Sequence, residues 1–399
     1  MDEPRTGPLA GIRVLDVSTV LAGPLACQIL GDYGADVVKV EHPDGDALRR
    51  HGAQRDGQGL WWKVVGRNKR CVGLYLGDPD GAEIFERLAA TADVVVENFR
   101  PGTLERWGLG PDRLRELNPG LVLCRITGFG QEGPYAGRPA FGTLIEAMSG
   151  FASMTGEPDG LPTLPPFGLA DSVAALSAVA AVTMALRHRD ATGQGQVIDQ
   201  SILEPLVTAL GPHIVNYDQL GVTPERTGNR STNNAPRNTY RTADDHWVAV
   251  SSSADSIARR AVTLVGRPDL AEQPWFTSGT GRAEHVEEID DAMAAWIGER
   301  SVDDVVAAFA EADVALAPLY DVAQYVDDPQ VRHRGAVVTV DDDDLGPVRM
   351  QNVLFQMSDT PGEVRHTGRA IGADTDQVLT EVGVPQHRID ELRSRKVVA

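Results

Sequence analysis

The sequence predicts an α/β protein whose larger part is a parallel sheet covered by helices. Three observations lead to this prediction. Short β-rich runs alternate with helical patterns over the first 130 residues, which is typical of a parallel sheet packed between helices. A long apolar segment near the middle of the chain predicts a buried helix. A further series of strand and helix patterns begins at residue 246 and indicates a second, smaller α/β domain.

The predicted elements of the first 130 residues alternate between strand and helix. Pro79 and Pro111 each begin a predicted helix, where the missing N–H of proline would have no partner in any case. This order predicts a Rossmann-like unit. The predicted strands are Ile12–Val17, Asp36–Glu41, Cys71–Leu76, Asp93–Glu97 and Leu121–Ile126, and the predicted helices lie near Pro24–Tyr33, Pro79–Ala90 and Pro111–Leu117.

The middle of the chain combines an apolar helix with a polar crossing segment. A run rich in Ala, Val and Leu extends from Asp171 to His188 and is apolar nearly all round, so we expect it to be buried. A second helix is expected over Ile202–Leu210. The stretch Gly211–Arg237 is rich in Asn, Thr, Pro and Gly and predicts a linker or an extended crossing segment.

The rest of the chain predicts a small domain inserted between two pieces of a larger one. It opens with the strand His246–Ser251, followed by helical patterns near Ser256–Val265, Glu284–Glu299 and Val302–Glu311. A strand over Ala336–Val340 leads into Asp341–Asp344, which we interpret as a solvated turn rather than a metal site. The predicted domains are 1–210 (large domain), 211–240 (linker), 241–325 (small α/β domain) and 326–399 (return to the large domain).

The chain is acidic, and its acidity is unevenly distributed. Its 37 Lys and Arg against 57 Asp and Glu give a formal net charge of −20. Binding to nucleic acid requires a basic face that neutralises phosphates, so the charge argues against nucleic acid as a partner. Residues 1–150 hold 17 basic and 20 acidic residues, whereas residues 201–399 hold 18 and 32. An anionic ligand is therefore expected in the first half.

Cysteine usage and hydropathy favour a soluble protein of the cytoplasm. Cys27, Cys71 and Cys124 lie far apart without CxxC spacing, so we expect neither a disulfide framework nor a metal site. The first residues lack the basic region and apolar core of a signal peptide. The longest low-charge stretch, Ser172–Leu186, falls short of the roughly 20 residues that span a bilayer. We therefore expect no interaction with a membrane.

Several short motifs could bind an anion, but each is weak by itself. The turn Leu21-Ala22-Gly23-Pro24 has one glycine where a dinucleotide fingerprint requires three, which argues against NAD. The run Arg67–Arg70 and the segment Glu97–Gly102, followed by Arg106, could bind phosphate or carboxylate, although ordinary solvated turns are the favoured interpretation. The glycine-rich segment Thr127–Pro134 lacks the Gly-Lys-Ser/Thr ending of a P-loop.

Asp171 has two interpretations at the start of its apolar helix. As an N-cap it would stabilise the helix by about 1 kcal/mol. As a nucleophile it would attack an activated acyl group, with the helix terminus helping to keep the carboxylate ionised. Composition and spacing alone favour the cap. The sequence contains neither a GxSxG elbow nor an HExxH helix, which argues against serine-triad and metal-assisted hydrolysis.

Nine motifs follow one another along the chain. They are Leu9–Asp16, Leu21–Pro24, Gly34–Glu41, Arg67–Arg70, Ala92–Gly102, Gly128–Pro134, Thr192–Gln196, Asp328–Gln330 and Gly372–Gly383. In this order they resemble the family III CoA-transferases, also called the CaiB/BaiF family, over essentially the whole chain. The resemblance implies an interlocked, ring-like homodimer in which each chain is threaded through the other. The segment Gly211–Arg237 would supply the extended linker that such a ring requires.

The resemblance also implies a function and reverses the preference for a cap at Asp171. In that family an Asp at this place is the nucleophile, and CoA passes from an acyl-CoA to a free carboxylic acid through an aspartyl mixed anhydride and an aspartyl-CoA thioester. A free Asp, with a pKa of about 3.9, is almost wholly ionised near neutrality, so activation would mainly require desolvation and orientation. CoA is then a substrate, and no tightly bound cofactor is expected.

The CoA contacts of the family carry over to four short segments. Formyl-CoA-transferase-like members have an Arg shortly after the second strand, where Pro43 stands here, so Arg49 or Arg50 is expected to serve the phosphates. A glycine-rich loop of some members is replaced by Ser231–Arg237. The implied CoA contacts are Leu21, Ala22, Leu74, Tyr75, Leu76, Gly77, Asn98, Phe99, Arg100, Arg106, Ala140, Phe141, Gly142 and Thr143.

Two other functions remain open alongside CoA transfer. The α-methylacyl-CoA racemases look similar in the N-terminal half but pair the Asp with a His just after the GFGQxGP segment. Phe141 stands in that stretch here and cannot transfer a proton, which favours the transferase. The second alternative is a catalytically silent CoA-binding protein. The acids exchanged are not encoded in an evident motif, although Arg138 and Arg237 could each bind the second carboxylate of a dicarboxylic acid.

Overall fold

The computed structural model describes residues 6–399, which form two compact units. The larger unit contains the residues up to Gly150, then Pro165–Gly211 and Gln330–Ala399. The smaller unit contains Phe151–Leu164 and Pro212–Pro329. The chain therefore leaves the larger unit and returns to it twice, and the residues from Phe151 to Leu164 group with the smaller unit.

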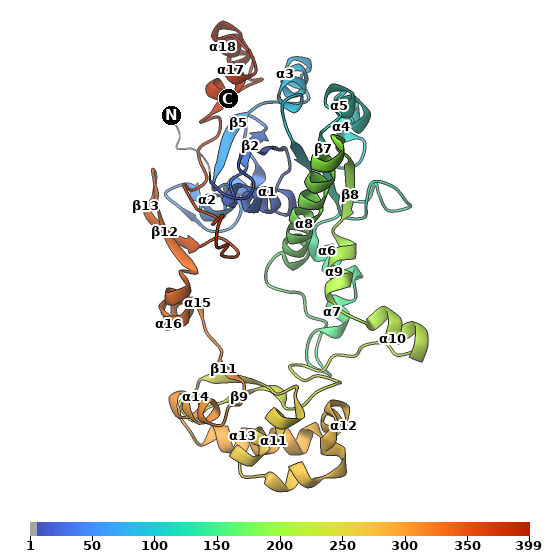
Figure 1. The fold of residues 1–399 in the computed structure, drawn as a ribbon, viewed down its shortest axis with the longest axis vertical. Coiled ribbons are helices and arrows are strands. Elements are labelled where there is room, and N and C mark those ends of the chain that lie inside the picture. The colour runs from blue at the N-terminus through green and yellow to red at the C-terminus, as the bar shows by residue number, and fades with distance from the viewer. Residues whose placement is uncertain (1–5) are drawn as a thin grey trace. The chain divides into compact units, whose positions relative to one another are not determined.

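A six-stranded parallel sheet forms the centre of the larger unit (Figure 1). Every neighbouring pair in it is parallel, and the order along the sheet is β5-β2-β1-β6-β7-β8. This is the order of a Rossmann-like doubly wound sheet, so the predicted α/β class is confirmed. The strands are β1 (Arg13–Asp16), β2 (Asp36–Glu41), β5 (Lys69–Gly73), β6 (Val94–Glu97), β7 (Val122–Thr127) and β8 (Val197–Ser201).

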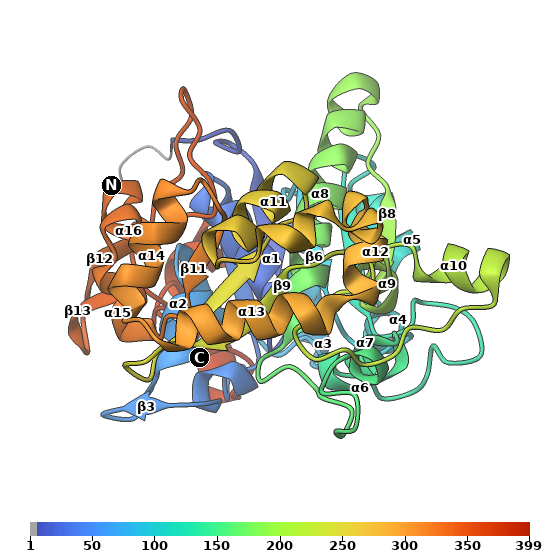
Figure 2. The same ribbon diagram turned by 90° about the horizontal axis from the view of Figure 1, so that it is seen from below.

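Helices cover both faces of this sheet because successive side chains of a buried strand point to opposite sides. Val14 packs in one apolar cluster and the next residue, Leu15, in another. The first cluster contains α1 (Ala22–Asp32) and α8 (Leu169–Thr192), which pack against each other (Figures 1 and 2). The second contains α3 (Pro79–Ala89), α5 (Pro111–Leu117), α17 (Thr375–Glu381) and α18 (Gln386–Ser394).

Helix α8 is the longest element, and small side chains let it approach the sheet closely. Ala170, Ala174 and Ala178 are fully buried at a helical spacing of four residues. The helix ends at Gly193, whose φ of 75° is the left-handed conformation that favours glycine. By length and composition α8 is apolar enough to cross a membrane, a test that a core helix of a soluble protein also passes.

Shorter elements complete the larger unit. The predicted strand over Ala336–Val340 is β12 (Val337–Asp342), which pairs with β13 (Gly346–Gln351) in a hairpin. The Asp341–Asp344 segment is not uniformly solvated, because Asp342 is buried and paired with Lys63 at 2.9 Å. The remaining elements are η1 (Ala47–Arg50), β3 (Gln54–Arg55), β4 (Gln58–Gly59), α2 (Leu60–Val65), α4 (Thr103–Arg106), α6 (Gly142–Met148), α9 (Leu203–Ala209) and, at the boundary of the units, α16 (Pro329–Arg334).

The smaller unit has its own antiparallel sheet, of order β11-β10-β9, and its own apolar core. Its three predicted helical segments are α11, α13 and α14. The segment predicted as a linker contains helix α10 and the start of β9. The elements are α7 (Phe151–Met154), α10 (His213–Leu220), β9 (Arg237–Arg241), β10 (Trp247–Ser251), α11 (Asp255–Leu264), η2 (Pro268–Glu272), η3 (Pro274–Thr277), α12 (Gly279–Glu284), α13 (Val286–Gly298), α14 (Val302–Glu311), β11 (Leu316–Pro318) and α15 (Val322–Asp327).

The basic run Arg67–Arg70 is neither a solvated turn nor an open anion site. Arg67 donates to the carboxylate of Asp32 at 2.6 Å, and the amide of Asn68 donates to the same carboxylate at 2.8 Å. Arg70 pairs with Asp36 at 2.5 Å. All four side chains of the run are buried. Both interpretations of the run are therefore wrong, because its charges are used inside the protein.

A buried cluster of ion pairs joins the first three strands of the sheet. Lys69 Nζ lies 2.8 Å from Asp16 and also donates to the carbonyl of Pro24 in α1 at 2.7 Å. Lys39 lies 3.0 Å from Asp46 and 3.9 Å from Asp16. Burial alone would raise the pKa of Asp16, but the two lysines outweigh burial and hold this pKa below its usual value. The cluster therefore fixes the end of β1 in place.

Lys69→Met tests the importance of this cluster for stability. Removing Lys69 leaves the buried Asp16 with only one, longer ion pair, to Lys39, and such a loss typically lowers the free energy of unfolding by about 3–5 kcal/mol. Urea unfolding followed by circular dichroism measures the change. Arg87→Gln is the control, because Arg87 pairs with Glu83 on an exposed surface. A loss in Lys69→Met no larger than in the control would contradict this account.

Candidate active site

Asp171 lies in the first turn of α8 and does not cap it. The helix begins at Leu169, and the residue before it, Gly168, makes no side-chain cap. Asp171 is therefore inside the helix, and the N-cap interpretation is wrong. Its half-buried carboxylate accepts a hydrogen bond from the N–H of Gly142, the first residue of α6. The nucleophile suggested by the resemblance thus lies between the starts of two helices.

Two glycines allow this close approach. A Cβ atom at Gly142 would lie 2.7 Å from Oδ2 of Asp171, a distance that real Cβ contacts essentially never show. A Cβ at Gly168 would lie 2.8 Å from Cδ2 of Leu21 and 3.5 Å from the same carboxylate oxygen. Three predicted positions, Leu21, Gly142 and Asp171, therefore lie together, and any side chain at Gly142 would displace the carboxylate.

A second carboxylate, that of Glu146 in α6, lies near Asp171. Its side chain is 1% exposed and accepts a hydrogen bond from the N–H of Ala170 at 3.0 Å. Burial, and then the negative charge of Glu146, raise the pKa of Asp171 to about 6, against the opposing hydrogen bond from Gly142. Glu146 was not predicted from the sequence, although an acidic residue inside the apolar run Leu144–Met148 is a detectable signal of a functional residue.

The turn after β1 is held by hydrogen bonds from both neighbouring strands. Asp16 accepts a hydrogen bond from the N–H of Ser18 at 3.1 Å, and Lys39 donates to the carbonyl of the same residue. The amide of Asn98 binds Thr19 twice, accepting from its N–H and donating to its carbonyl, each at 2.7 Å. Asn98 is among the predicted CoA contacts, and its side chain fixes this turn.

The turn lies where ligands collect in open α/β sheets. The strand order reverses between β1 and β6, and such a switch point opens a crevice at the carboxyl ends of the strands. Val20, at φ 65°, adopts a left-handed conformation that β-branched residues rarely take. Its N–H is held by Asp46 at 3.2 Å. Strain of this kind is common at functional sites, where surrounding contacts maintain it.

A cavity of about 170 Å³ lies at the same sheet edge. Five of the predicted CoA contacts line it, and they come from two separate segments, Asn98–Arg100 and Ala140–Phe141. Arg138 also lines it, with its guanidinium stacked on the ring of Tyr135 at 3.6 Å. The lining residues are Asn98, Phe99, Arg100, Pro101, Thr127, Gly128, Ala136, Arg138, Pro139, Ala140 and Phe141.

The other predicted contacts lie at varied depths. Ala22, Leu74 and Leu76 are buried in the apolar cores, whereas Tyr75 is 41% exposed and packs edge-on against His42. Because their side chains are buried, Ala22, Leu74 and Leu76 could contact a ligand mainly through their backbone atoms. Three other predicted contacts lie near the surface: Gly77, Arg106, which donates to Thr103, and Thr143.

Arg49 does not fit the phosphate role expected of it. Its guanidinium donates to both carboxylate oxygens of Glu41, at 2.8 and 2.6 Å, and to the carbonyl of Arg369 at 2.9 Å. It also stacks on Trp62 at 3.8 Å. The exposed Arg50 makes one long contact, of 3.4 Å, to a carbonyl. Of the two arginines, only Arg50 has a guanidinium that is largely uncommitted.

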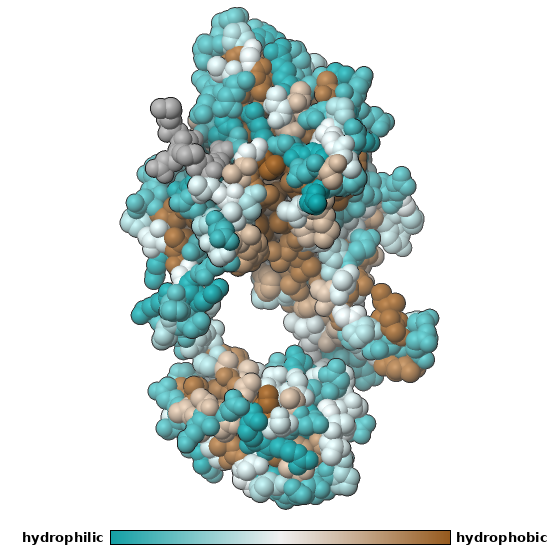
Figure 3. Space-filling view, in the orientation of Figure 1, coloured by the Kyte–Doolittle hydropathy of each residue, from teal (hydrophilic) through white to brown (hydrophobic). Residues whose placement is uncertain are grey.

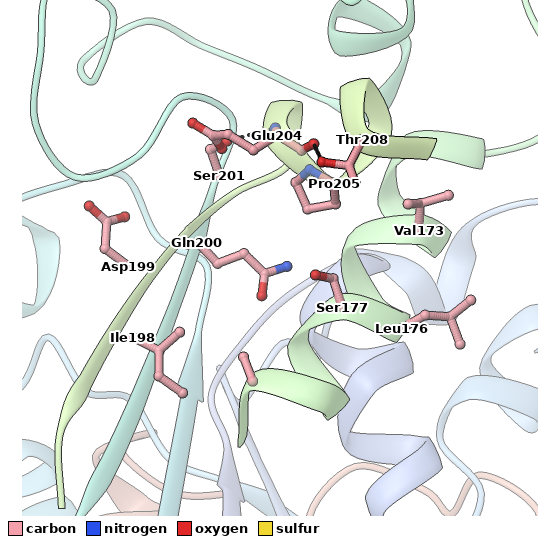
Figure 4. A pocket seen from close by; sticks show the side chains of 11 residues that line it. Val173, Leu176, Ser177, Ile198, Asp199, Gln200, Ser201, Glu204, Pro205 and Thr208 are labelled. Carbon is pink, nitrogen blue, oxygen red and sulfur yellow. Dashed lines mark hydrogen bonds between the residues drawn. The ribbon is translucent and has the colours of Figure 1, made fainter. Parts of the chain in front are cut away.

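A larger groove of about 690 Å³ lies between α8, β8 and α9 (Figure 4). Several of its polar side chains already have partners within the protein. Gln200 donates to the carbonyl of Ala174 at 2.7 Å, and Asp199 accepts from the N–H of Gln131 at 3.1 Å. Leu176 adds an apolar wall and is 45% exposed. The groove therefore combines an apolar wall with polar side chains, of which Gln200 and Asp199 are already paired.

The comparisons with known proteins agree on one family. The family model described as CoA-transferase family III matches residues 9–375. The chain belongs to CoA-transferase family III. Within residues 6–399 of this CoA-transferase, no group of three or more His, Cys, Asp or Glu could hold a metal ion.

Its relatives match over nearly their full lengths. Succinyl-CoA–D-citramalate CoA-transferase of Chloroflexus aurantiacus is 40% identical over 394 residues, or 98% of each chain. Succinate–glutarate CoA-transferase of Agrobacterium fabrum is 35% identical over 386 residues, or 95% of this chain and 96% of the relative. The crystal structure of a CaiB/BaiF family protein from Brucella suis has a TM-score of 0.83 and 32% identity, covering 95% of this chain and 100% of that chain.

The pKa of Asp171 predicts an acid limb in the pH profile of kcat/KM. Because the pKa is raised to about 6, activity that depends on an ionised Asp171 is expected to fall as the pH drops through 6 and this carboxylate is protonated. In Glu146→Gln the limb should move to lower pH, since the charge is lost while burial of Asp171 and an acceptor for Ala170 remain. Glu116→Gln, on the exposed surface of α5, should leave it unchanged. Identical limbs in wild type and Glu146→Gln would contradict the assignment.

Proposed function

We propose that this CoA-transferase moves CoA from succinyl-CoA to a second dicarboxylic acid of four or five carbons. The names of relatives at 40% and 35% identity, which pair succinyl-CoA with D-citramalate and succinate with glutarate, support this substrate class. The observation that carries the proposal is the half-buried Asp171 carboxylate beside Gly142. The cavity that reaches the adjacent Phe141 contains two arginines able to bind anions.

In the proposed mechanism, Asp171 is the nucleophile. Its carboxylate attacks the thioester carbonyl of succinyl-CoA, and the C–S bond breaks to give a mixed anhydride and CoA thiolate. The thiolate attacks the aspartyl carbonyl, which releases succinate and leaves an aspartyl-CoA thioester. The incoming carboxylate attacks this thioester and re-forms an anhydride and a thiolate. Attack of the thiolate on the new acyl carbonyl then yields the product thioester and free Asp171.

All the CoA contacts implied by the resemblance belong to this proposal, and the side chain of Asn98 also holds the turn after β1. The Arg100 and Arg138 guanidiniums are suited to the anionic parts of the substrates. Transfer is favoured over racemisation, because Phe141 stands where the racemases have a His and is not a base. No tightly bound cofactor, nucleic acid or membrane enters the proposal, and the enzyme is assigned to the cytoplasm.

The homodimer implied by the resemblance is also part of the proposal. Exposed apolar side chains support it, because large apolar surfaces mark sites of association. Figure 3 shows hydrophobic surface over α8 and over α10. Met184 of α8 is 71% exposed, and no residue of α10 is buried. In α10, Ile214, Tyr217 and Leu220 are each more than 60% exposed.

The direct test is a transfer assay with purified protein. Succinyl-CoA is incubated with malate, citramalate, mesaconate or glutarate, and the CoA thioesters are separated by chromatography. Wild type is expected to form at least one new thioester, and Asp171→Ala to lower the rate by at least about 10⁴-fold. Asp190→Asn, on the exposed end of the same helix, is the matched control and should remain active. Transfer by Asp171→Ala at the wild-type rate would contradict the proposal.

A further inference from the structure

The hydroxyl of Thr127 is an unpaired polar group at the end of β7. The residue is 8% exposed, and its Oγ1 is buried without a hydrogen-bond partner. Its backbone is satisfied differently, since its carbonyl accepts from the N–H of Ile202 at 2.8 Å. Buried hydroxyls in proteins are nearly always paired, and an unpaired one destabilises the fold. Function is one reason for such a group to be retained.

Thr127 lines the 170 Å³ cavity beside the proposed active site. The other polar side chains of the cavity differ from it. Asn98 is committed to Thr19, and the guanidinium of Arg138, on an exposed residue, is stacked on Tyr135. Thr127 is therefore a neutral, buried group that can both donate and accept a hydrogen bond, in a cavity whose cations suit phosphate or carboxylate.

We propose that the Thr127 hydroxyl binds an amide of the pantetheine arm of CoA. This inference rests on the proposed function, because a CoA thioester must place its carbonyl at Asp171. The arm that leads there is uncharged and carries two amides, which match a neutral hydroxyl better than a guanidinium. The cavity reaches Phe141, and the next residue, Gly142, donates to the Asp171 carboxylate. Thr127 and Phe141, the residue before Gly142, therefore line the same cavity.

The stability of the ligand-free Thr127→Val variant distinguishes a binding role of the hydroxyl from a structural role. Valine has the shape of threonine without its hydroxyl. If the hydroxyl serves only a ligand, Thr127→Val removes an unpaired group and should leave the ligand-free protein as stable as wild type, or more stable. If the hydroxyl supports the fold, the same variant should be less stable. Thr127→Ser keeps the hydroxyl and is the conservative control.

Calorimetric titration with CoA, together with thermal unfolding of the ligand-free proteins, tests this inference. Thr127→Val is expected to bind CoA about 3- to 10-fold more weakly than wild type, the effect of losing one hydrogen bond. Its melting temperature should not fall, and Thr127→Ser should bind within about twofold of wild type. Adenosine 3′,5′-bisphosphate, which lacks the pantetheine arm, should bind equally to wild type and to Thr127→Val.

Each contrary outcome has a separate meaning. Unchanged CoA affinity in Thr127→Val overturns the role of Thr127 and leaves the proposed function intact. Weaker binding accompanied by a lower melting temperature assigns the hydroxyl to the fold and also overturns the inference. An equal loss of affinity for adenosine 3′,5′-bisphosphate would place the hydroxyl at the nucleotide instead of the arm. Failure of wild type to bind CoA would contradict the proposed function itself.

Discussion

The buried ion pairs around Asp16 are the interaction on which the rest of the active site depends. Asp16 ends β1 and is reached by Lys69 from β5, two strands away in the sheet. Isolated buried charges are unfavourable, so the cluster is stable only while its members remain paired. The same groups hold Ser18, so a constraint inside the sheet determines the path of the turn above it. This turn positions Leu21 against Gly168, directly before the helix that carries Asp171.

The environment of Asp171, the proposed nucleophile, serves two opposing requirements. A nucleophile must be ionised near neutral pH, yet a strongly solvated or strongly paired carboxylate reacts poorly. Burial and Glu146 raise its pKa to about 6, which leaves about nine-tenths of the groups ionised at pH 7. The Gly142 hydrogen bond opposes this rise and fixes the direction of the carboxylate. The structure therefore corrects the expectation of an ordinary Asp pKa and adds electrostatic tuning to desolvation and orientation.

Local patterns in the sequence predicted the parallel sheet and the apolar helix, because alternating strands and helices have strong periodic signals. They missed β8, whose sequence Val197–Ser201 is half polar, and the helix α10, which has no buried face to create a pattern. The basic run Arg67–Arg70 was misinterpreted because its partners Asp32 and Asp36 are more than 30 residues away. Pairing over such separations is set by the fold and leaves no local signature.

The residues of the proposed active site likewise divide into those that the sequence predicts and those that only the structure reveals. Asp171 is predictable from the order of the motifs, whereas Glu146 acts through its burial and Thr127 through the lack of a partner, and both are properties of the packed structure. For Asn98, the sequence predicted that its segment lies at the sheet edge. The hydrogen bond from its side chain to the neighbouring turn was not predictable from the sequence.

The most direct test of the account is chemical trapping of the intermediate on Asp171. Wild-type protein is incubated with succinyl-CoA and no acceptor acid, treated with hydroxylamine, digested and analysed by mass spectrometry. The account predicts a hydroxamate on the Asp171 side chain that depends on succinyl-CoA. An unmodified Asp171 in protein that still transfers CoA, or a modification at Glu146 instead, would contradict it.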